Sequence, residues 1–134
     1  MEFGVESPPQ RVMRRRGIMS EFLDKAITAH SAWKGRLRNA IESGQAPDVA
    51  SIRPDNHCDL GKWIYGDGAC HQHLPEFQEL KSQHAKFHQA AADMVEMIRK
   101  GDTAKARNDL DAGAFAGASM KVITAIANLR KKLN

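Results

Sequence analysis

Apolar residues recur every three or four positions along most of the chain, the spacing that places them on one face of an α-helix. Three such runs cover residues 19–43, 75–100 and 103–132, and Gly44 and Gly101 close the first two. The 59 residues after Pro75 contain no proline that could interrupt a helix. The chain shows neither the alternation of a β-strand nor an internal repeat. The sequence therefore predicts an all-α fold, an antiparallel four-helix-type bundle.

The side chains expected to face the core follow from this spacing. In the first predicted helix they are Leu23, Ala26, Ile27, His30, Trp33, Leu37 and Ile41. In the second they are Phe77, Leu80, His84, Phe87, His88, Ala91, Met94, Val95 and Ile98. In the last they are Ala106, Leu110, Ala114, Gly117, Met120, Ile123, Thr124 and Ala127. We expect the last helix to continue without a break to about Lys132.

The connection between the first two long helices contains structure of its own. Residues 45–56 are rich in Pro, Asp and Ser, which is typical of a loop. A short helix is predicted at residues 58–65, where Leu60, Trp63 and Ile64 form an apolar face that can hold it against the bundle. The bundle is thus expected to carry a short helix in the connection after its first helix.

The length of 134 residues fits a single domain that can bury a core. Residues 1–18 are polar and lack periodicity, so they are predicted to be a disordered tail, and residues 19–134 are predicted to form the bundle. Met13 and Met19 are both possible natural starts.

The net charge of +4 comes from the two ends of the chain. Residues 17–129 hold 13 basic and 14 acidic side chains, and the few aromatic residues lie within apolar patterns. We therefore expect no nucleic-acid partner. No window approaches 18 uncharged apolar residues and no secretory signal is present, so we expect no membrane insertion. Two cysteines do not make a disulfide framework, which favours a cytoplasmic location.

Three histidines lie on the predicted apolar faces: His30, His84 and His88. Residues four apart share one face of a helix with β-carbons about 5–6 Å apart, so His84 and His88 are placed to bind one ion together. Single histidines at such positions are also common as hydrogen-bonded core residues. Cys58 is the candidate for a fourth ligand. The alternative is a small buried apolar residue, but a thiol buried beside three histidines without a metal would be an unusual packing choice, so the metal ligand is favoured. One thiolate and three imidazoles favour a tetrahedral Zn²⁺ site.

Other polar residues nearby are weaker candidates. We expect His57 to lie next to the ligands or in solvent rather than to bind the metal. Asp55 and Asp59 are expected to cap the short helix, with orientation of a liganding imidazole as the alternative. A Cys-His-x-His cluster in the following loop leaves a second, exchangeable metal site open. It consists of Cys70, His71 and His73.

Three segments resemble the chemoreceptor zinc-binding domain family (CZB). They are the run Asp55-Asn56-His57-Cys58-Asp59-Leu60-Gly61-Lys62-Trp63-Ile64-Tyr65-Gly66, the pattern Pro75-x-Phe77-x-x-Leu80-x-x-x-His84-x-x-Phe87-His88, and Ala29-His30-x-x-Trp33. The similarity spans roughly residues 20–130. In this family a first-helix histidine, the motif cysteine and the paired histidines bind zinc. The resemblance therefore implies zinc bound by His30, Cys58, His84 and His88.

The resemblance also implies a function. Members are cytoplasmic sensory modules of bacterial signal transduction that act with chemoreceptors or diguanylate cyclases, often as homodimers. The motif cysteine is linked with sensing of oxidants such as hypochlorous acid, which implies a redox-reactive Cys58. Whether the signal is zinc, oxidant or pH, and whether the chain is a whole protein or a regulatory domain of a larger one, are left open.

An enzyme is not expected, because four protein ligands leave no open position on a zinc ion. Two alternatives follow from the same residues. In a catalytic zinc bundle protein one of the four would not be a ligand, and water would take its place. In a purely structural protein the zinc would only stabilise a dimerisation module.

Overall fold

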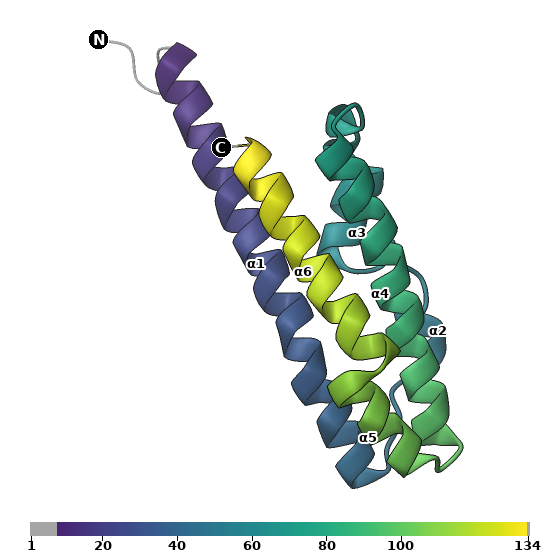
Figure 1. Cartoon of the computed structure of the whole chain (residues 1–134). Helices are drawn as coiled ribbons and strands as arrows, with labels where there is room; N and C mark the ends of the chain where they lie inside the picture. The colour runs from purple at the N-terminus through teal and green to yellow at the C-terminus, as the bar shows by residue number, and fades with distance from the viewer. Residues whose placement is uncertain (1–7, 134) are drawn as a thin grey trace.

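The computed structural model describes residues 8–133, and within them it is helical with no strand, as predicted (Figure 1). The element order is α1 (Pro8–Ser43), α2 (Val49–Ile52), α3 (Asp59–Tyr65), the 3₁₀ helix η1 (Asp67–His71), α4 (Pro75–Arg99), α5 (Thr103–Ala112) and α6 (Ala114–Leu133). The short helix expected in the connection after the first helix is therefore confirmed as α3.

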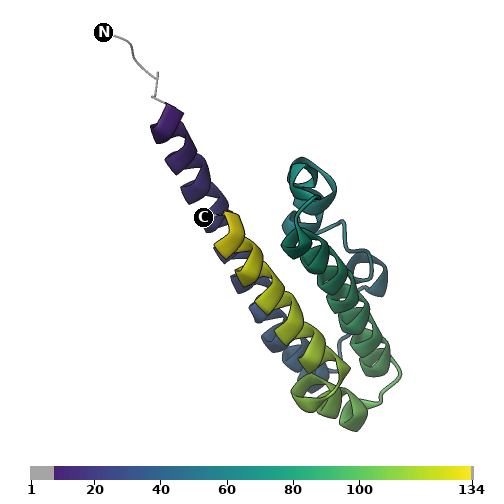
Figure 2. The ribbon, with the colours of Figure 1, turned by 45° about the horizontal axis from the view of Figure 1, so that its top comes forward.

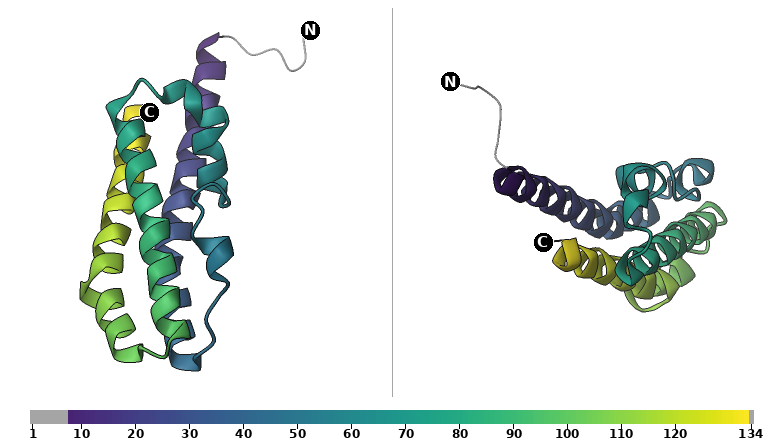
Figure 3. Two further views of the ribbon diagram at one scale, coloured as in Figure 1. Left: turned by 90° about the vertical axis from the view of Figure 1, so that its right-hand side faces the viewer. Right: turned by 90° about the horizontal axis from the view of Figure 1, so that it is seen from above.

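The long helices α1, α4 and α6 lie side by side, with α6 antiparallel to the other two (Figures 1 and 2). The connection that contains α2, α3 and η1 returns along the bundle from the end of α1 to the start of α4, as Figure 3 shows. This segment takes the place of a regular second helix. The arrangement is a four-helix-type bundle in which one arm consists of short helices joined by loops.

The core forms where the apolar faces of the first two predicted long helices meet α6. The expected core positions of α1 and α4 are buried or half-buried, and Leu23, Leu37, Leu80 and Val95 have no exposed surface. Phe87 of α4 lies with its ring centroid 5.4 Å from that of Phe115 on α6. The predicted helical periodicity of these two segments is confirmed.

The last predicted helix is wrong in one respect, because it breaks at Gly113 into α5 and α6. The side chain of Asp109 accepts a hydrogen bond of 2.7 Å from the backbone N–H of Ala114 and so caps the start of α6. A Cβ at Gly113 would overlap this aspartate.

The break also moves the buried face of α6 relative to the predicted one. Ala106 and Leu110 on α5 are buried as expected, but Met120 on α6 is 73% exposed and Ala114 lies in solvent. The buried positions of α6 are Phe115, Val122, Ala125, Ile126 and Leu129. The predicted face failed because an uninterrupted period was carried across the break.

The first helix starts at Pro8, well before the predicted start at residue 19. Residues 1–7 of the predicted disordered tail lie outside the described residues, whereas residues 8–18 continue the helix and extend past the end of α6 (Figure 1). Proline is well tolerated in the first turn of a helix, since its missing N–H has no partner there. The arginine-rich sequence that follows contains good helix formers.

Contrary to the expectation that no window comes close, the segment Thr103–Leu133 contains an 18-residue window of mean hydropathy 1.3, enough by length and composition to cross a membrane. Core helices of soluble proteins pass the same test. The buried side chains of α5 and α6 belong to the core of the bundle that they share with α1 and α4. The expectation that the chain does not insert into a membrane stays a prediction.

Candidate metal centre

The structure brings together the four residues that the sequence analysis selected. His30 lies in the middle of α1, Cys58 directly before α3, and His84 and His88 one turn apart on α4. Each offers one ligand atom, and these four atoms lie within 4.8 Å of one another. The three histidines are at most 4% exposed, and Cys58 is half-buried. The bundle thus holds three imidazoles and one thiol in a single buried cluster.

Backbone carbonyls orient two of the three imidazoles. The Nδ1 atom of His30 lies 2.7 Å from the carbonyl oxygen of Ala26, one turn earlier on α1. The Nδ1 atom of His88 lies 2.8 Å from the carbonyl oxygen of Ile52 at the end of α2. A carbonyl only accepts, so each Nδ1 carries the proton, and each Nε2 presents a lone pair to the cluster.

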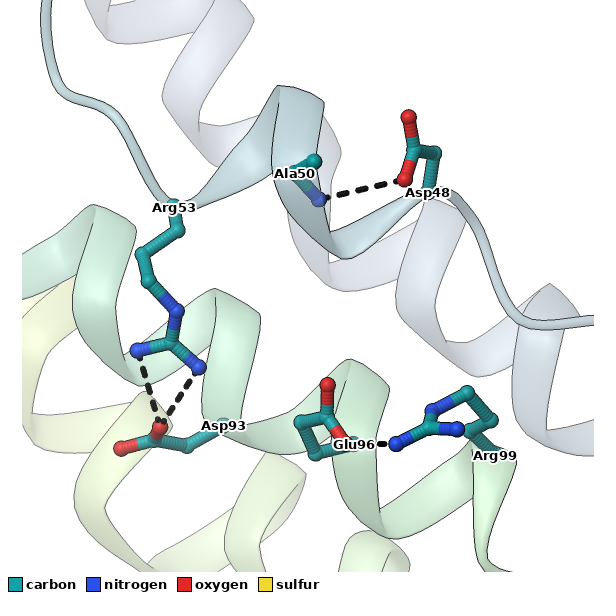
Figure 4. Close-up of polar contacts among 6 residues, drawn as sticks. All are labelled: Asp48, Ala50, Arg53, Asp93, Glu96 and Arg99. Atoms are coloured by element: carbon teal, nitrogen blue, oxygen red, sulfur yellow. Dashed lines mark hydrogen bonds and ion pairs between the residues drawn. The ribbon is translucent and has the colours of Figure 1, made fainter.

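The α2 segment that supplies the Ile52 carbonyl is itself fixed at two points (Figure 4). The carboxylate of Asp48 accepts a hydrogen bond of 3.2 Å from the N–H of Ala50, which caps α2. The guanidinium of Arg53 lies 3.4 Å from the carboxylate of Asp93 on α4. The first contact is local to α2, and the second, an exposed ion pair, links α2 to the helix that carries His88.

Cys58 is positioned by the turn that starts α3. It is the N-cap residue, and its Sγ atom accepts a hydrogen bond of 3.4 Å from the N–H of Gly61. The hydroxyl of Tyr65 at the end of α3 donates a bond of 2.6 Å to the carboxylate of Asp55 before it. A Cβ at Gly61 would overlap the backbone carbonyl of Asp55, so only glycine allows this close approach.

Burial keeps the cluster uncharged when it holds no cation. It lowers the pKa of His84 to about 2, with smaller contributions from His88 and His30, and it lowers the pKa values of those two histidines as well. Burial likewise raises the pKa of the Cys58 thiol. A bound cation would change this balance, because it stabilises a thiolate and neutral imidazoles.

The spacing of three of the four ligand atoms fits a tetrahedral zinc ion, and the fourth, from His30, lies within 4.8 Å of them. Zinc bonds of about 2.0 Å to nitrogen and 2.3 Å to sulfur place ligand atoms roughly 3.3–3.6 Å apart. The Cys58 Sγ atom lies 3.2 Å from His84 Nε2 and 3.5 Å from His88 Nε2, and the two Nε2 atoms are 3.1 Å apart. The Nε2 atom of His30 is buried without a hydrogen-bond partner, so a metal would satisfy it. The residues present therefore fit zinc.

The weaker candidates lie elsewhere. His57 is exposed, which agrees with the expectation that it lies next to the ligands or in solvent rather than binding the metal. Capping by Asp55 or Asp59 was wrong, because Cys58 caps α3 itself and Asp55 binds Tyr65. Within the described residues, Cys70, His71 and His73 do not form a group that could hold a metal. The Cys70 thiol instead donates to the carbonyl of Asp67.

Two contributors to the site were missed in the sequence analysis. The Ile52 carbonyl could not be found from residue type, because any residue offers the same group. The bond between Tyr65 and Asp55 could have been suspected from the sequence, since both residues flank Cys58 within the segment that carries the family resemblance.

An all-α bundle that gathers three imidazole nitrogens and one cysteine sulfur is a metal-binding helical domain. Residues 30–95, 66 of the 134 residues, match the family model of the chemoreceptor zinc-binding domain (CZB). The matched segment includes all four residues of the cluster. Members of this family are regulatory sensory domains. Comparisons with curated proteins and with solved structures gave no significant match.

Proposed function

We propose that the chain is a sensory domain of bacterial signal transduction that binds one Zn²⁺ through His30, Cys58, His84 and His88. The observation that carries the proposal is the convergence of four ligand atoms within 4.8 Å. The unpartnered Nε2 atom of His30 supports it, because a buried lone pair without a partner is costly unless a ligand satisfies it.

A regulatory role fits this ligand set better than catalysis. Zinc enzymes keep an open coordination position for water or substrate, whereas three nitrogens and one sulfur from the protein fill a tetrahedral shell. The catalytic alternative needs one of the four residues to be displaced. X-ray absorption of the zinc-loaded chain separates the two, since a catalytic site would show a light-atom ligand in place of one imidazole or the sulfur.

The proposed switch is Cys58 with the α3 segment. His84 and His88 lie on a 25-residue helix, whereas Cys58 precedes a helix of only seven residues. Loss of the zinc–sulfur bond, by zinc release or by oxidation of the thiolate, would therefore free α3 before it moves the histidines. Oxidants such as hypochlorous acid are the proposed second signal.

The proposed output is a shift of α1 in a cytoplasmic homodimer that controls a chemoreceptor or a diguanylate cyclase. The exposed face of α6 supports a dimer, because Met120 is 73% exposed and the small residue Gly117 lies one turn before it on the same face. Sedimentation of the zinc-loaded chain tests this, with Met120→Glu expected to shift the population to monomer. A monomer at all concentrations would contradict the dimer.

Zinc content tests the ligand assignment directly. Purified chain should hold one zinc, and Cys58→Ala, His84→Ala and His88→Ala should each weaken binding strongly because each removes one of four ligands. His57→Ala and His73→Ala are matched controls, since both histidines are exposed and neither belongs to the cluster. Full zinc occupancy in a Cys58→Ala, His84→Ala double variant would contradict the proposal. Resistance to mild chelators would favour the purely structural alternative.

A further inference from the structure

A cavity of about 400 Å³ separates α1 from the start of α3 and leads to the metal centre. Cys58 and His30 both line it, whereas His84 and His88 do not. We call it the α1–α3 cavity. It approaches the cluster from the side of the one ligand that is half-buried rather than buried.

The cavity exists because small residues stand between large ones on α1. Phe22 and Trp33 both line it, and the lining residues between them on α1 include the small residues Ala26 and Ala29. Phe22 is fixed by the Trp63 ring at 5.6 Å, and Trp33 by the Phe87 ring at 6.4 Å. Since both aromatic rings pack against other rings, they keep their positions, and the space next to Ala26 and Ala29 is a lasting feature of the fold.

The charged residues that line the cavity favour the entry of a negatively charged solute. Lys25 and Arg36 line it from α1, and Asp59 is the one carboxylate among its lining residues. The guanidinium of Arg36 lies 3.9 Å above the Trp33 ring, which fixes this positive charge beside the cavity. Two cations against one carboxylate raise the local concentration of anions.

We propose that the α1–α3 cavity is the access route by which small anionic solutes that react with a thiol reach Cys58. This inference rests on the proposed function, because it assigns a path to the ligand that we propose as the switch. The class comprises compact anions with one electrophilic atom, small enough for a cavity of about 400 Å³.

A pair of methanethiosulfonates tests the route, one bearing a sulfonate and the other a trimethylammonium group. The Cys58 sulfur attacks the sulfenyl sulfur of either reagent, a mixed disulfide forms, and methanesulfinate leaves with the electron pair of the broken S–S bond. The thiol proton, where present, passes to buffer. Cysteine sulfur is oxidised to the disulfide, while the sulfonyl sulfur is reduced to the sulfinate.

The measurement is the ratio of the anionic to the cationic rate at Cys58 in a Cys70→Ser background. The reference is the same ratio at the exposed Cys70 in a Cys58→Ser variant, which corrects for intrinsic reagent reactivity. We expect the ratio at Cys58 to exceed the reference by about threefold to tenfold at low salt and to approach it at high salt. Lys25→Glu with Arg36→Glu should reverse the preference, and both residues are exposed, so the fold should persist.

The second part of the experiment fills the α1–α3 cavity with a larger side chain. Ala29→Leu should slow both reagents about fivefold or more, because the larger side chain at this exposed lining position takes up part of the cavity. Ala90 and Lys86 line a separate groove between α4 and α6. Ala90→Leu is therefore the matched control for the filled cavity and Lys86→Glu for the charge reversal, and both should leave the two rates unchanged. The proposed route would be refuted if an Ala29→Leu chain of normal helicity reacted with both reagents at the rates of the parent chain. It would also be refuted if the Lys25→Glu, Arg36→Glu chain kept the parent ratio of anionic to cationic rates.

The same assays on zinc-loaded and chelated protein separate this inference from the proposed function. A chain that holds no zinc would contradict the metal site, yet the charge preference and the Ala29→Leu effect at Cys58 would still decide the route. Conversely, normal zinc binding with no effect of either change would leave the metal site standing and refute the cavity as its access.

Discussion

The hydroxyl of Tyr65 lies 2.6 Å from the carboxylate of Asp55, and this bond joins the two ends of the segment that carries Cys58. Asp55 precedes the N-cap cysteine and Tyr65 closes α3, so the bond fixes the turn between them. The bond raises the pKa of Tyr65 to about 12, because the hydroxyl proton is held by an acceptor that carries negative charge.

The raised Tyr65 pKa is directly measurable, since the chain contains one tyrosine. Absorbance at the tyrosinate band should give an apparent pKa well above the ordinary value of about 10. Asp55→Asn should return it towards that value, because the amide removes the negative charge. Asp59→Asn is the matched control, since Asp59 has no bond to Tyr65. A normal pKa in the parent chain would show that the turn is not closed by this bond.

Gly61 offers a second test of the same turn. Gly61→Ala should weaken zinc binding at least tenfold and lower the free energy of unfolding by about 1–3 kcal/mol, because the added methyl overlaps the Asp55 carbonyl and displaces Cys58. Gly35→Ala is the control, since a Cβ there meets nothing and alanine favours the helix by about 0.5–1 kcal/mol. Zinc titration with a chromophoric chelator and urea unfolding give the two quantities. Equal effects of the two changes would contradict the steric argument.

The helical period was enough to predict the core faces of α1 and α4 and the three histidines that lie on them, whereas Cys58 was selected as the candidate fourth ligand from the short segment that it opens. It worked because both helices run without a break through positions such as His30 and His84, so spacing alone sets which side chains share a face. It failed after Gly113, because the cap formed by Asp109 is a local contact that spacing does not encode. This one break shifted the buried face of α6, so that Ala114 and Met120 are exposed while Ile123 is still partly buried against the core.

The groups that orient the ligand side chains could not be predicted as readily from the sequence. The acceptor for His88 is the carbonyl of Ile52, which lies 36 residues away in the chain. Its position depends on how the irregular connection returns along α4, and no residue type marks it. The α1–α3 cavity is hidden for the same reason, because the space between α1 and the start of α3 depends on how segments far apart in the sequence pack together.

Zinc removal should lower thermal stability without unfolding the chain. The long helices bury their own apolar faces, so the chelated protein should keep most of its helical circular dichroism. Free zinc at 100 times its dissociation constant should add about 2.7 kcal/mol to the free energy of unfolding, which appears as a higher melting temperature. Cys58→Ala is the control, and its melting temperature should respond little to zinc. A melting temperature unchanged by strong chelation at neutral pH would contradict this expectation.

The metal-free protein should lose stability as pH falls below the ordinary histidine pKa of about 6.5. Burial lowers the pKa values of His30, His84 and His88 in the folded chain, so below that pH the unfolded state binds more protons. The free energy of unfolding should then fall by up to about 1.4 kcal/mol per pH unit for each histidine that stays neutral.

Urea unfolding between about pH 5 and 7.5 in the presence of chelator measures this slope, which spans the range around the ordinary histidine pKa. His84→Gln should reduce it by one histidine's share, whereas His73→Gln, an exposed position, should not. A stability independent of pH across this range would show that the three imidazoles do not stay neutral on folding.

Hydrogen exchange with and without zinc tests where the proposed switch lies. Cys58 joins α3 to the cluster through a single side chain, and His30 is the only cluster residue on α1, so both segments depend on the metal for part of their anchoring. Protection on zinc binding should therefore increase most around residues 20–40 and 55–68. Residues 84–98 should change least, because their helix packs against α6 whether or not zinc is bound. A uniform change, or one concentrated in α6, would refute the switch even with the zinc site confirmed.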